Sequence, residues 1–123
     1  MRRAGGRAVV LVVEDELLIR LYAVAMIEDA GFEVLEAANA DEAILIWENR
    51  SDIRIVFTDV HMAGSMDGLR LAHAVRDRWL PIKLIVTSGQ MMVSESELPT
   101  GGRFVSEPYQ ASEISRVLNE LAA

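Results

Sequence analysis

The sequence contains no cysteine and no long apolar run, and each absence excludes certain classes of protein. Without cysteine, the chain has no disulfide framework, no thiolate metal site and no thiol nucleophile. The apolar run at residues 8–13 is far too short to cross a membrane. The basic residues 1–7 do not form a secretory signal with this run, because Glu14 and Asp15 follow at once. We therefore expect a cytoplasmic protein with no membrane partner, in which residues 1–7 form a flexible leader.

Positive charge is also scarce, with 12 basic residues against 19 acidic ones and a net charge of -7. A net negative charge repels the phosphate backbone of nucleic acids, and the sequence has no stripe of basic residues to counteract it. We therefore expect no nucleic-acid partner. Hydrophobic residues make up 51% of the chain, which is enough for a sizeable core. The length of 123 residues fits one domain, and no linker, repeat or low-complexity tract divides it.

Short apolar runs alternate with longer segments whose apolar residues have helical spacing. The predicted strands cover residues 8–13, 32–37, 53–58, 82–87 and 103–106. The predicted helices cover residues 15–30, 40–50, 67–78 and 109–122. Residues 89–102 are rich in glycine and polar residues, so we expect the helix there to be short or irregular. In the first helix, the apolar stripe consists of Leu17, Leu18, Leu21, Val24, Ala25 and Ile27.

Alternating strands and helices predict an α/β domain whose parallel sheet is covered by helices on both faces. With right-handed crossovers, five strands have the expected order 2-1-3-4-5, and the switch point lies between strands 1 and 3. Ligands bind such sheets at the carboxyl ends of the strands, beside that point. Glu14 and Asp15 follow the first strand and Asp59 follows the third, so acids meet where the fold rule predicts a site.

Carboxylates gathered at one edge repel each other unless a cation lies between them. The oxygen donors of Glu14, Asp15 and Asp59 therefore favour a hard cation, Mg²⁺, next to one reactive carboxylate. Simpler roles remain open. Asp59 is also compatible with a cap at a strand end, and Glu14 and Asp15 with capping of the next helix and interaction with its dipole.

Five motifs occur in order along the chain, four at the end of a predicted strand and one at the start of the predicted helix 67–78. They are VLVVEDE (residues 10–16), FTDVHM (57–62), MDG (66–68), IVTSG (85–89) and FVSEPY (104–109). With these motifs, the chain resembles the receiver domain of two-component response regulators from about Val9 to Leu121. The resemblance implies a single receiver domain over residues 1–123 with the flavodoxin-like receiver fold.

The resemblance also implies a phosphoacceptor function. In this family, a histidine kinase or a phosphotransfer protein donates a phosphoryl group to an aspartate that matches Asp59. Acids that match Glu14 and Asp15 hold Mg²⁺ together with that aspartate, and the residue that matches His61 offers its backbone carbonyl to the metal. The chemistry is attack of a carboxylate on phosphorus, and the cation neutralises the phosphoryl oxygens.

Two further positions form the switch in this family. A hydroxyl residue that matches Thr87 hydrogen-bonds the phosphoryl group, and an aromatic residue that matches Phe104 swings inward on activation. The resemblance thus implies a phosphoprotein of a two-component system or phosphorelay, and not a turnover enzyme. Its output partner is unknown, and weak homodimerisation stays open.

Glu107 departs from the family pattern, which has lysine at this position. The lysine pairs with the phosphoacceptor aspartate and then with the phosphoryl oxygens, so a glutamate removes an attraction and adds a repulsion. We do not expect Lys83 or Arg103 to replace it, because both lie nearer the other end of their strands. A degenerate receiver that binds proteins without being phosphorylated is therefore an alternative function. We interpret the neighbouring Tyr109 as a surface recognition residue.

Overall fold

The computed structural model describes residues 8–59, 68–78, 82–88, 98 and 102–122, and a five-stranded parallel sheet forms its centre. The strands are β1 (Val9–Val13), β2 (Glu33–Ala37), β3 (Ile53–Asp59), β4 (Lys83–Ser88) and β5 (Arg103–Ser106). The helices are α1 (Leu17–Asp29), α2 (Ala40–Asn49), α3 (Gly68–Arg78) and α4 (Ala111–Ala122). The strand order β2-β1-β3-β4-β5 confirms the predicted topology.

The strands differ in composition according to their place in the sheet. β1 consists of valine and leucine only and is buried throughout, as is typical of a central parallel strand. β2 lies at one edge of the sheet, and its residues Glu33 and Glu36 are exposed. In the β3–β4 pair, Asp59 is the register partner of Thr87, so both residues lie at the carboxyl edge of the sheet.

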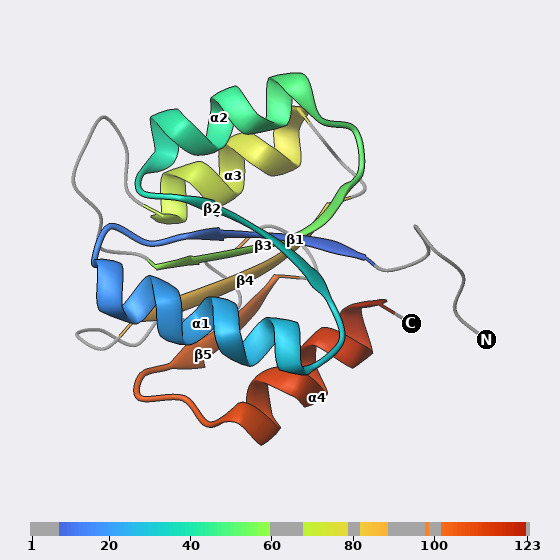
Figure 1. Ribbon diagram of the computed structural model, residues 1–123. Helices are drawn as coiled ribbons and strands as arrows, with labels where there is room; N and C mark the ends of the chain where they lie inside the picture. The colour runs from blue at the N-terminus through green and yellow to red at the C-terminus, as the bar shows by residue number, and fades with distance from the viewer. Residues whose placement is uncertain (1–7, 60–67, 79–81, 89–97, 99–101, 123) are drawn as a thin grey trace.

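Helices cover both faces of the sheet, with α2 and α3 on one face and α1 and α4 on the other (Figure 1). Because side chains alternate along a strand, the same strands contribute to a core on each face. The α2/α3-face core includes Leu11, Val13, Val56, Leu84, Val86, Ala43, Trp47, Leu71 and Val75. The α1/α4-face core includes Val10, Val12, Phe57, Ile85, Val105, Ala23, Met26, Ile27, Ile114 and Leu118.

The start of α2 is closed by a reciprocal cap. Asn39 Oδ1 accepts a hydrogen bond from the Glu42 backbone N–H at 2.9 Å, and Glu42 Oε1 accepts one from the Ala38 N–H at 2.8 Å. These contacts satisfy two backbone donors that a helix start otherwise leaves unpaired. The end of α1 is set by Gly31, whose φ of +99° lies in the region that favours glycine.

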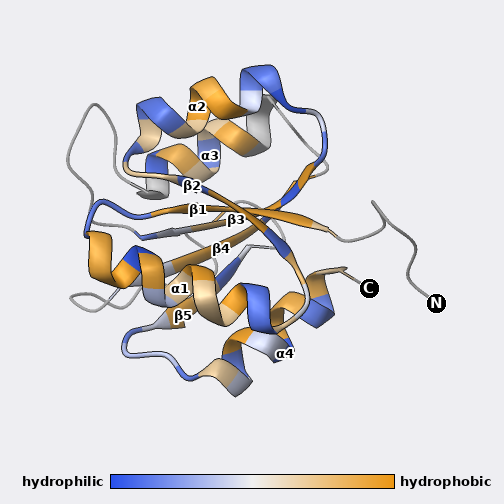
Figure 2. Ribbon diagram, in the orientation of Figure 1, coloured by the Kyte–Doolittle hydropathy of each residue, from blue (hydrophilic) through white to orange (hydrophobic). Residues whose placement is uncertain are grey.

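The beginning of α1 departs from the predicted apolar stripe. Leu17, Leu18 and Leu21 are 56%, 80% and 47% exposed, whereas Ala23, Met26 and Ile27 are buried. Figure 2 shows apolar colour at this end of the helix, next to the carboxyl edge of the sheet. The predicted stripe is thus confirmed at Ile27, and Val24 packs against the core, but it is wrong at Leu17, Leu18, Leu21 and Ala25. Nearly every residue from 17 to 27 is apolar, so spacing alone does not decide which side faces the sheet.

Some predictions fall on parts of the chain that lie outside the described residues. These are the leader at residues 1–7, His61, and the short or irregular helix at 89–102 apart from Leu98 and Gly102. Leu98 itself is buried in the α2/α3-face core. Within the part of the chain that the structure describes, no helix is long and apolar enough to cross a membrane.

Candidate functional site

Three carboxylates lie together at the carboxyl edge of the sheet. Glu14 and Asp15 directly follow β1, and Asp59 is the last residue of β3. One ligand oxygen from each side chain lies within 4.8 Å of the other two. The register explains this proximity, because Val13 is the partner of Thr58 and the next residues along the two chains are Glu14 and Asp59. The structure therefore brings together the three acids that the sequence predicts at this edge.

Glu14 is the most deeply buried of the three acids, with 5% of its surface exposed. Its backbone N–H donates to the Ala37 carbonyl at 3.0 Å, and its Oε2 accepts the Glu16 N–H at 3.1 Å. Burial raises the pKa of Glu14 to about 8; the hydrogen bond from Glu16 opposes the rise, and the charge of Asp59 adds to it. Glu14 therefore holds a proton at neutral pH unless a cation approaches.

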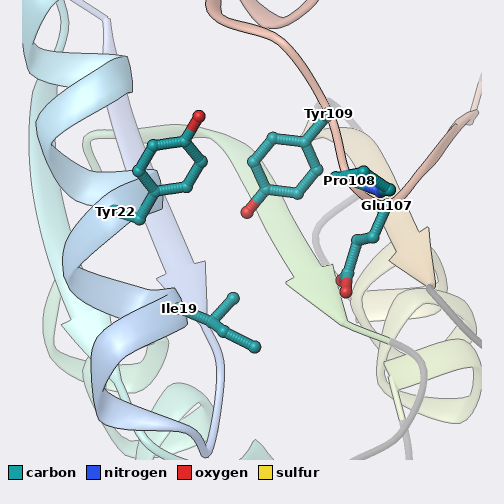
Figure 3. Close-up of a pocket in the computed structure, with 5 residues that line it drawn as sticks. All are labelled: Ile19, Tyr22, Glu107, Pro108 and Tyr109. Carbon is teal, nitrogen blue, oxygen red and sulfur yellow. The ribbon is translucent and has the colours of Figure 1, made fainter.

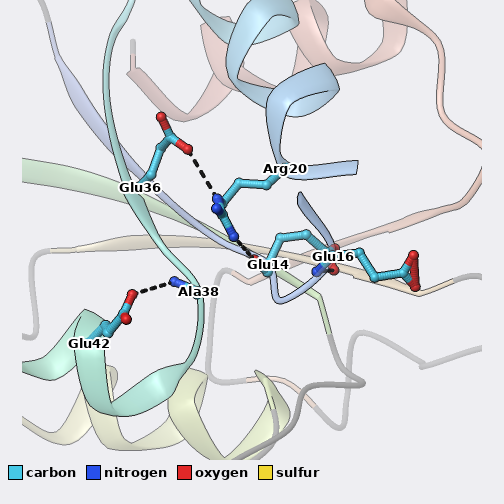
Figure 4. Close-up of polar contacts among 6 residues, drawn as sticks. All are labelled: Glu14, Glu16, Arg20, Glu36, Ala38 and Glu42. Carbon is cyan, nitrogen blue, oxygen red and sulfur yellow. Dashed lines mark hydrogen bonds and ion pairs between the residues drawn. The ribbon is translucent and has the colours of Figure 1, made fainter. Parts of the chain in front are cut away.

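Arg20 supports this cluster from α1, although sequence analysis did not single it out. Its Nη1 donates to the Glu14 carbonyl oxygen at 2.8 Å, and its Nε donates to Glu36 at 3.0 Å (Figure 4). Arg20 thus ties the segment after β1 to the edge strand β2. The signal that could have identified it is its isolation, since it is the only charged residue between Leu17 and Ile27.

Thr87 and Glu107 meet beside Asp59, in a contact that the sequence did not predict. Thr87 Oγ1 donates to Glu107 Oε2 at 3.1 Å. The backbone N–H of Glu107 donates to the Ser88 carbonyl at 2.9 Å, which holds the residue against the end of β4. The Glu107–Pro108 peptide bond is cis. Glu107 therefore adds another acid at the edge where Asp59 lies.

The described cations of β4 and β5 lie away from this edge. Lys83 is the register partner of Ile55, four residues before the Asp59–Thr87 pair. This offset corresponds to about 13 Å along a strand. Arg103 begins β5 and forms an ion pair with Glu120 at 2.7 Å. Neither side chain takes the place of the lysine that the resemblance leads one to expect, as their strand positions predict.

Phe104 does not join the acid cluster. It is half-buried and packs against the α2/α3-face core, and its register partner in β4 is Val86, the residue before Thr87. Its role as a switch aromatic stays a prediction, as does the metal contact of the His61 carbonyl, which lies outside the described residues.

Tyr109 is buried, so its interpretation as a surface recognition residue is wrong. Only 6% of its surface is exposed, and its ring lies edge-on to Phe57 with the centroids 5.6 Å apart. Tyr22 on α1 stacks on it at 6.1 Å. Burial raises the pKa of the Tyr109 hydroxyl, and the charge of Glu107 adds to this effect. The ring fills space between α1 and β3, a packing role that its loop position in the sequence does not reveal.

A pocket of about 550 Å³ opens between α1 and the segment that follows β5 (Figure 3). Its lining is apolar except for one carboxylate and the tyrosine hydroxyls, and consists of Ile19, Tyr22, Glu107, Pro108 and Tyr109. The pocket and the acid cluster share a boundary at Glu107, because this residue lines the pocket and also contacts Thr87.

The donor set of the cluster fits a hard divalent cation. Such cations bind carboxylate oxygens, and three of these lie within 4.8 Å of one another at Glu14, Asp15 and Asp59. Positive charge placed between them would offset the burial of Glu14 and its repulsion by Asp59, which together hold its pKa near 8. The site is therefore compatible with Mg²⁺.

The chain is thus a doubly wound α/β protein with an acidic cluster at the switch point of its sheet. The family model of the response regulator receiver domain matches residues 10–117. The chain belongs to this family.

The chain is similar to parts of longer signalling proteins. It is 32% identical over 120 residues to the sensor kinase CckA of Brucella abortus, covering 94% of this chain and 13% of that protein. It is 36% identical over 110 residues to the virulence transcriptional regulatory protein PhoP of Shigella flexneri, covering 85% of this chain and 48% of that protein. The chain thus spans less than half the length of either relative.

Solved structures show the same fold. The receiver domain of the hybrid histidine kinase CckA matches with a TM-score of 0.79 and 29% identity, covering 94% of this chain and 99% of that one. The receiver domain of NtrX from Brucella abortus matches with a TM-score of 0.82 and 28% identity, covering 91% of this chain and 96% of that one. A receiver protein from Sinorhizobium medicae, at 20% identity, matches with a TM-score of 0.85 over 94% of each chain and supports the fold alone.

Proposed function

We propose that the chain is a phosphoacceptor in which Asp59 receives a phosphoryl group from a histidine kinase or a phosphotransfer protein, with Mg²⁺ bound. The observation that carries the proposal is the position of Asp59. It ends β3 at the switch point, is partly exposed, and lies with Glu14 and Asp15 in one oxygen cluster. Membership of the receiver family, and a sensor kinase among the relatives, support it.

In the proposed reaction, an Asp59 carboxylate oxygen forms a bond to phosphorus while the bond from phosphorus to the donor's imidazole nitrogen breaks. That nitrogen takes the bonding electron pair and leaves as neutral imidazole when the other ring nitrogen carries a proton. Glu14, Asp15 and Asp59 are the side chains that would hold Mg²⁺, and family resemblance adds the His61 carbonyl. When bound, the cation supplies positive charge that offsets the charge of the phosphoryl oxygens.

The proposed role is that of a switch. Phosphorylation adds charge and strong acceptor oxygens at Asp59 and changes the protein contacts of the domain, so the chain signals without turning over a substrate. The proposed location of this switch is the cytoplasm. The output partner is not defined by any of the described residues.

A second candidate function is that of a degenerate receiver that binds proteins without being phosphorylated. The observation that favours it is Glu107, a further acid beside Asp59 that engages the Thr87 hydroxyl. A negative charge at this position opposes the arrival of a phosphoryl group, which is itself negatively charged.

The test is intact mass after incubation with Mg²⁺ and acetyl phosphate, for the wild type, Asp59→Asn and Glu107→Lys. Gain of one phosphoryl group by the wild type, and none by Asp59→Asn, supports the phosphoacceptor function. No gain by the wild type, with gain in Glu107→Lys, supports the degenerate receiver. Gain that persists in Asp59→Asn means that another residue is modified and contradicts the proposal.

A further inference from the structure

Glu107 is held by two hydrogen bonds to the end of β4. Its backbone N–H donates to the Ser88 carbonyl at 2.9 Å, and its Oε2 accepts the Thr87 hydroxyl at 3.1 Å. Thr87 is 1% exposed, so bulk water has little access to its hydroxyl. In the unphosphorylated protein, this hydroxyl therefore donates its proton in a hydrogen bond to Glu107.

Thr87 is also the register partner of Asp59 in the parallel β3–β4 pair. The side chains of such partners lie on the same face of the sheet, on backbones about 5 Å apart. A threonine hydroxyl carries one proton and donates it to one acceptor at a time. While Glu107 accepts that proton, an acceptor group attached to Asp59 cannot receive it.

We propose that Glu107 is a positioning residue that keeps the Thr87 hydroxyl turned away from Asp59 and thereby opposes phosphorylation. This inference rests on the proposed function, because the phosphoryl oxygens are the competing acceptors. The phosphorylated state forms only as the Thr87–Glu107 hydrogen bond breaks. Glu107 also lines the pocket beside Ile19 and Tyr109, so its release from Thr87 frees a carboxylate at the border of this pocket (Figure 3).

A simpler explanation is that Glu107 acts on Asp59 through its negative charge alone. The two explanations differ in how they depend on Thr87. Charge repulsion acts through space and persists when the Thr87 hydroxyl is removed. Competition for a proton ends when the hydroxyl is removed.

A double-mutant cycle on the rate of phosphorylation by acetyl phosphate with Mg²⁺ separates them. Glu107→Leu removes both the charge and the acceptor, and Thr87→Val removes the hydroxyl but keeps the shape. We expect Glu107→Leu to raise the rate constant about tenfold more when Thr87 is present than in the Thr87→Val background, as for the loss of one hydrogen bond to a charged group. Equal gains in the two backgrounds, or no gain with Thr87 present, would overturn the proposal.

Thr58 provides a matched control. It is a buried threonine at the neighbouring position of Asp59, and its Oγ1 donates to the Asp59 carbonyl at 3.1 Å. Thr58→Val makes the same chemical change as Thr87→Val without touching the Glu107 contact. The gain from Glu107→Leu should therefore be the same with and without Thr58→Val, and a reduced gain would contradict the assignment to Thr87.

The same Thr87 and Glu107 variants are compared in urea unfolding without phosphodonor or metal. We expect the two substitutions to be coupled by about fivefold in the unfolding equilibrium constant. No coupling overturns the inference whatever the phosphorylation result. Coupling without phosphorylation of any variant overturns the proposed function instead, and keeps Glu107 as the group that positions Thr87.

Discussion

Among the described residues, the ion pairs of Arg50 and Arg103 lie at the amino end of the sheet, whereas three acidic side chains meet within 4.8 Å at the carboxyl end. At the amino end, Arg50 lies 2.6 Å from Asp52 and 4.0 Å from Glu33. Arg103 at the start of β5 lies 2.7 Å from Glu120 of α4. These ion pairs are partly exposed, so each adds little to stability.

The carboxyl end has the opposite arrangement. Glu14, Asp15 and Asp59 converge within 4.8 Å, and Glu107 follows β5 at the same edge. Arg20 reaches this end, yet it contacts the backbone of Glu14 and the side chain of Glu36 rather than the cluster itself. The described amino end thus joins acids to bases, whereas the described carboxyl end brings together three acids whose oxygens are compatible with a divalent cation.

The largest expected effect is the pH dependence that Glu14 imposes on the metal-free protein. Its pKa is about 8 in the folded state, against 4.5 in the unfolded chain. Between these values only the folded state holds the proton, so stability falls as pH rises from about 5 to 8. The slope is about 1.4 kcal/mol per pH unit from this group. The neutral variant Glu14→Gln should lose this dependence and be more stable than the wild type by roughly 4 kcal/mol at pH 8.

Urea unfolding in EDTA between pH 5 and 8.5 measures this difference. Glu28→Gln makes the same chemical change at an exposed glutamate of α1, and this matched control should keep the fall in stability because Glu14 is unchanged. A wild-type stability that rises with pH relative to Glu14→Gln would contradict the account of the cluster.

The next effect concerns Mg²⁺ affinity, measured by calorimetric titration. Asp15→Asn should weaken binding by at least about tenfold, because one charged oxygen ligand is lost. Glu107→Lys should weaken it by less, through a positive charge near the cluster. Asp52→Asn, at the amino end, should leave the affinity within about twofold. Tighter binding by Glu107→Lys would show that Glu107 does not contribute negative potential to the site.

A smaller effect is expected at the start of α2, where side-chain caps stabilise the helix that follows β2. Asn39→Ala removes the acceptor of the Glu42 N–H and should cost about 1 kcal/mol in urea unfolding. The control is Asn49→Ala in the last turn of α2, where the exposed side chain only donates to the Leu45 carbonyl. If both substitutions lowered the free energy of unfolding equally, the Asn39 cap would stabilise α2 no more than the exposed Asn49 contact does.

The smallest effect is expected for the ion pairs of the amino end. In a cycle of Arg103→Met and Glu120→Gln, the coupling should be about twofold in the unfolding equilibrium constant and should vanish in 1 M salt. A coupling of tenfold or more, or one that salt does not change, would show that this pair contributes more to stability than an exposed ion pair does.

The topology and the meeting of Glu14, Asp15 and Asp59 could be predicted from the sequence. Both follow from local patterns, since buried strands are apolar and the carboxyl ends of parallel strands share one edge. The stripe of α1 could be predicted only in part, at Val24 and Ile27, because Leu17 and Ala23 lie in one nearly continuous apolar run.

The contacts that were missed join distant segments. Arg20 reaches across 16 positions to Glu36, and Thr87 across 20 to Glu107. Such contacts depend on side-chain rotamers and on the separation of packed elements, which no local spacing encodes. Tyr109 was misjudged for a related reason, because a residue outside the helices and strands can still fill space between them.

The edge strand β2 has a consequence for self-association. Glu33 and Glu36 are exposed on it, and each lies within an ion pair, with Arg50 and with Arg20. A second chain that added a strand to this edge would bring two of its own acids against them and desolvate the pairs. Charged edge strands resist intermolecular sheet extension for this reason. The β2 edge of the sheet is therefore protected against growth into aggregates.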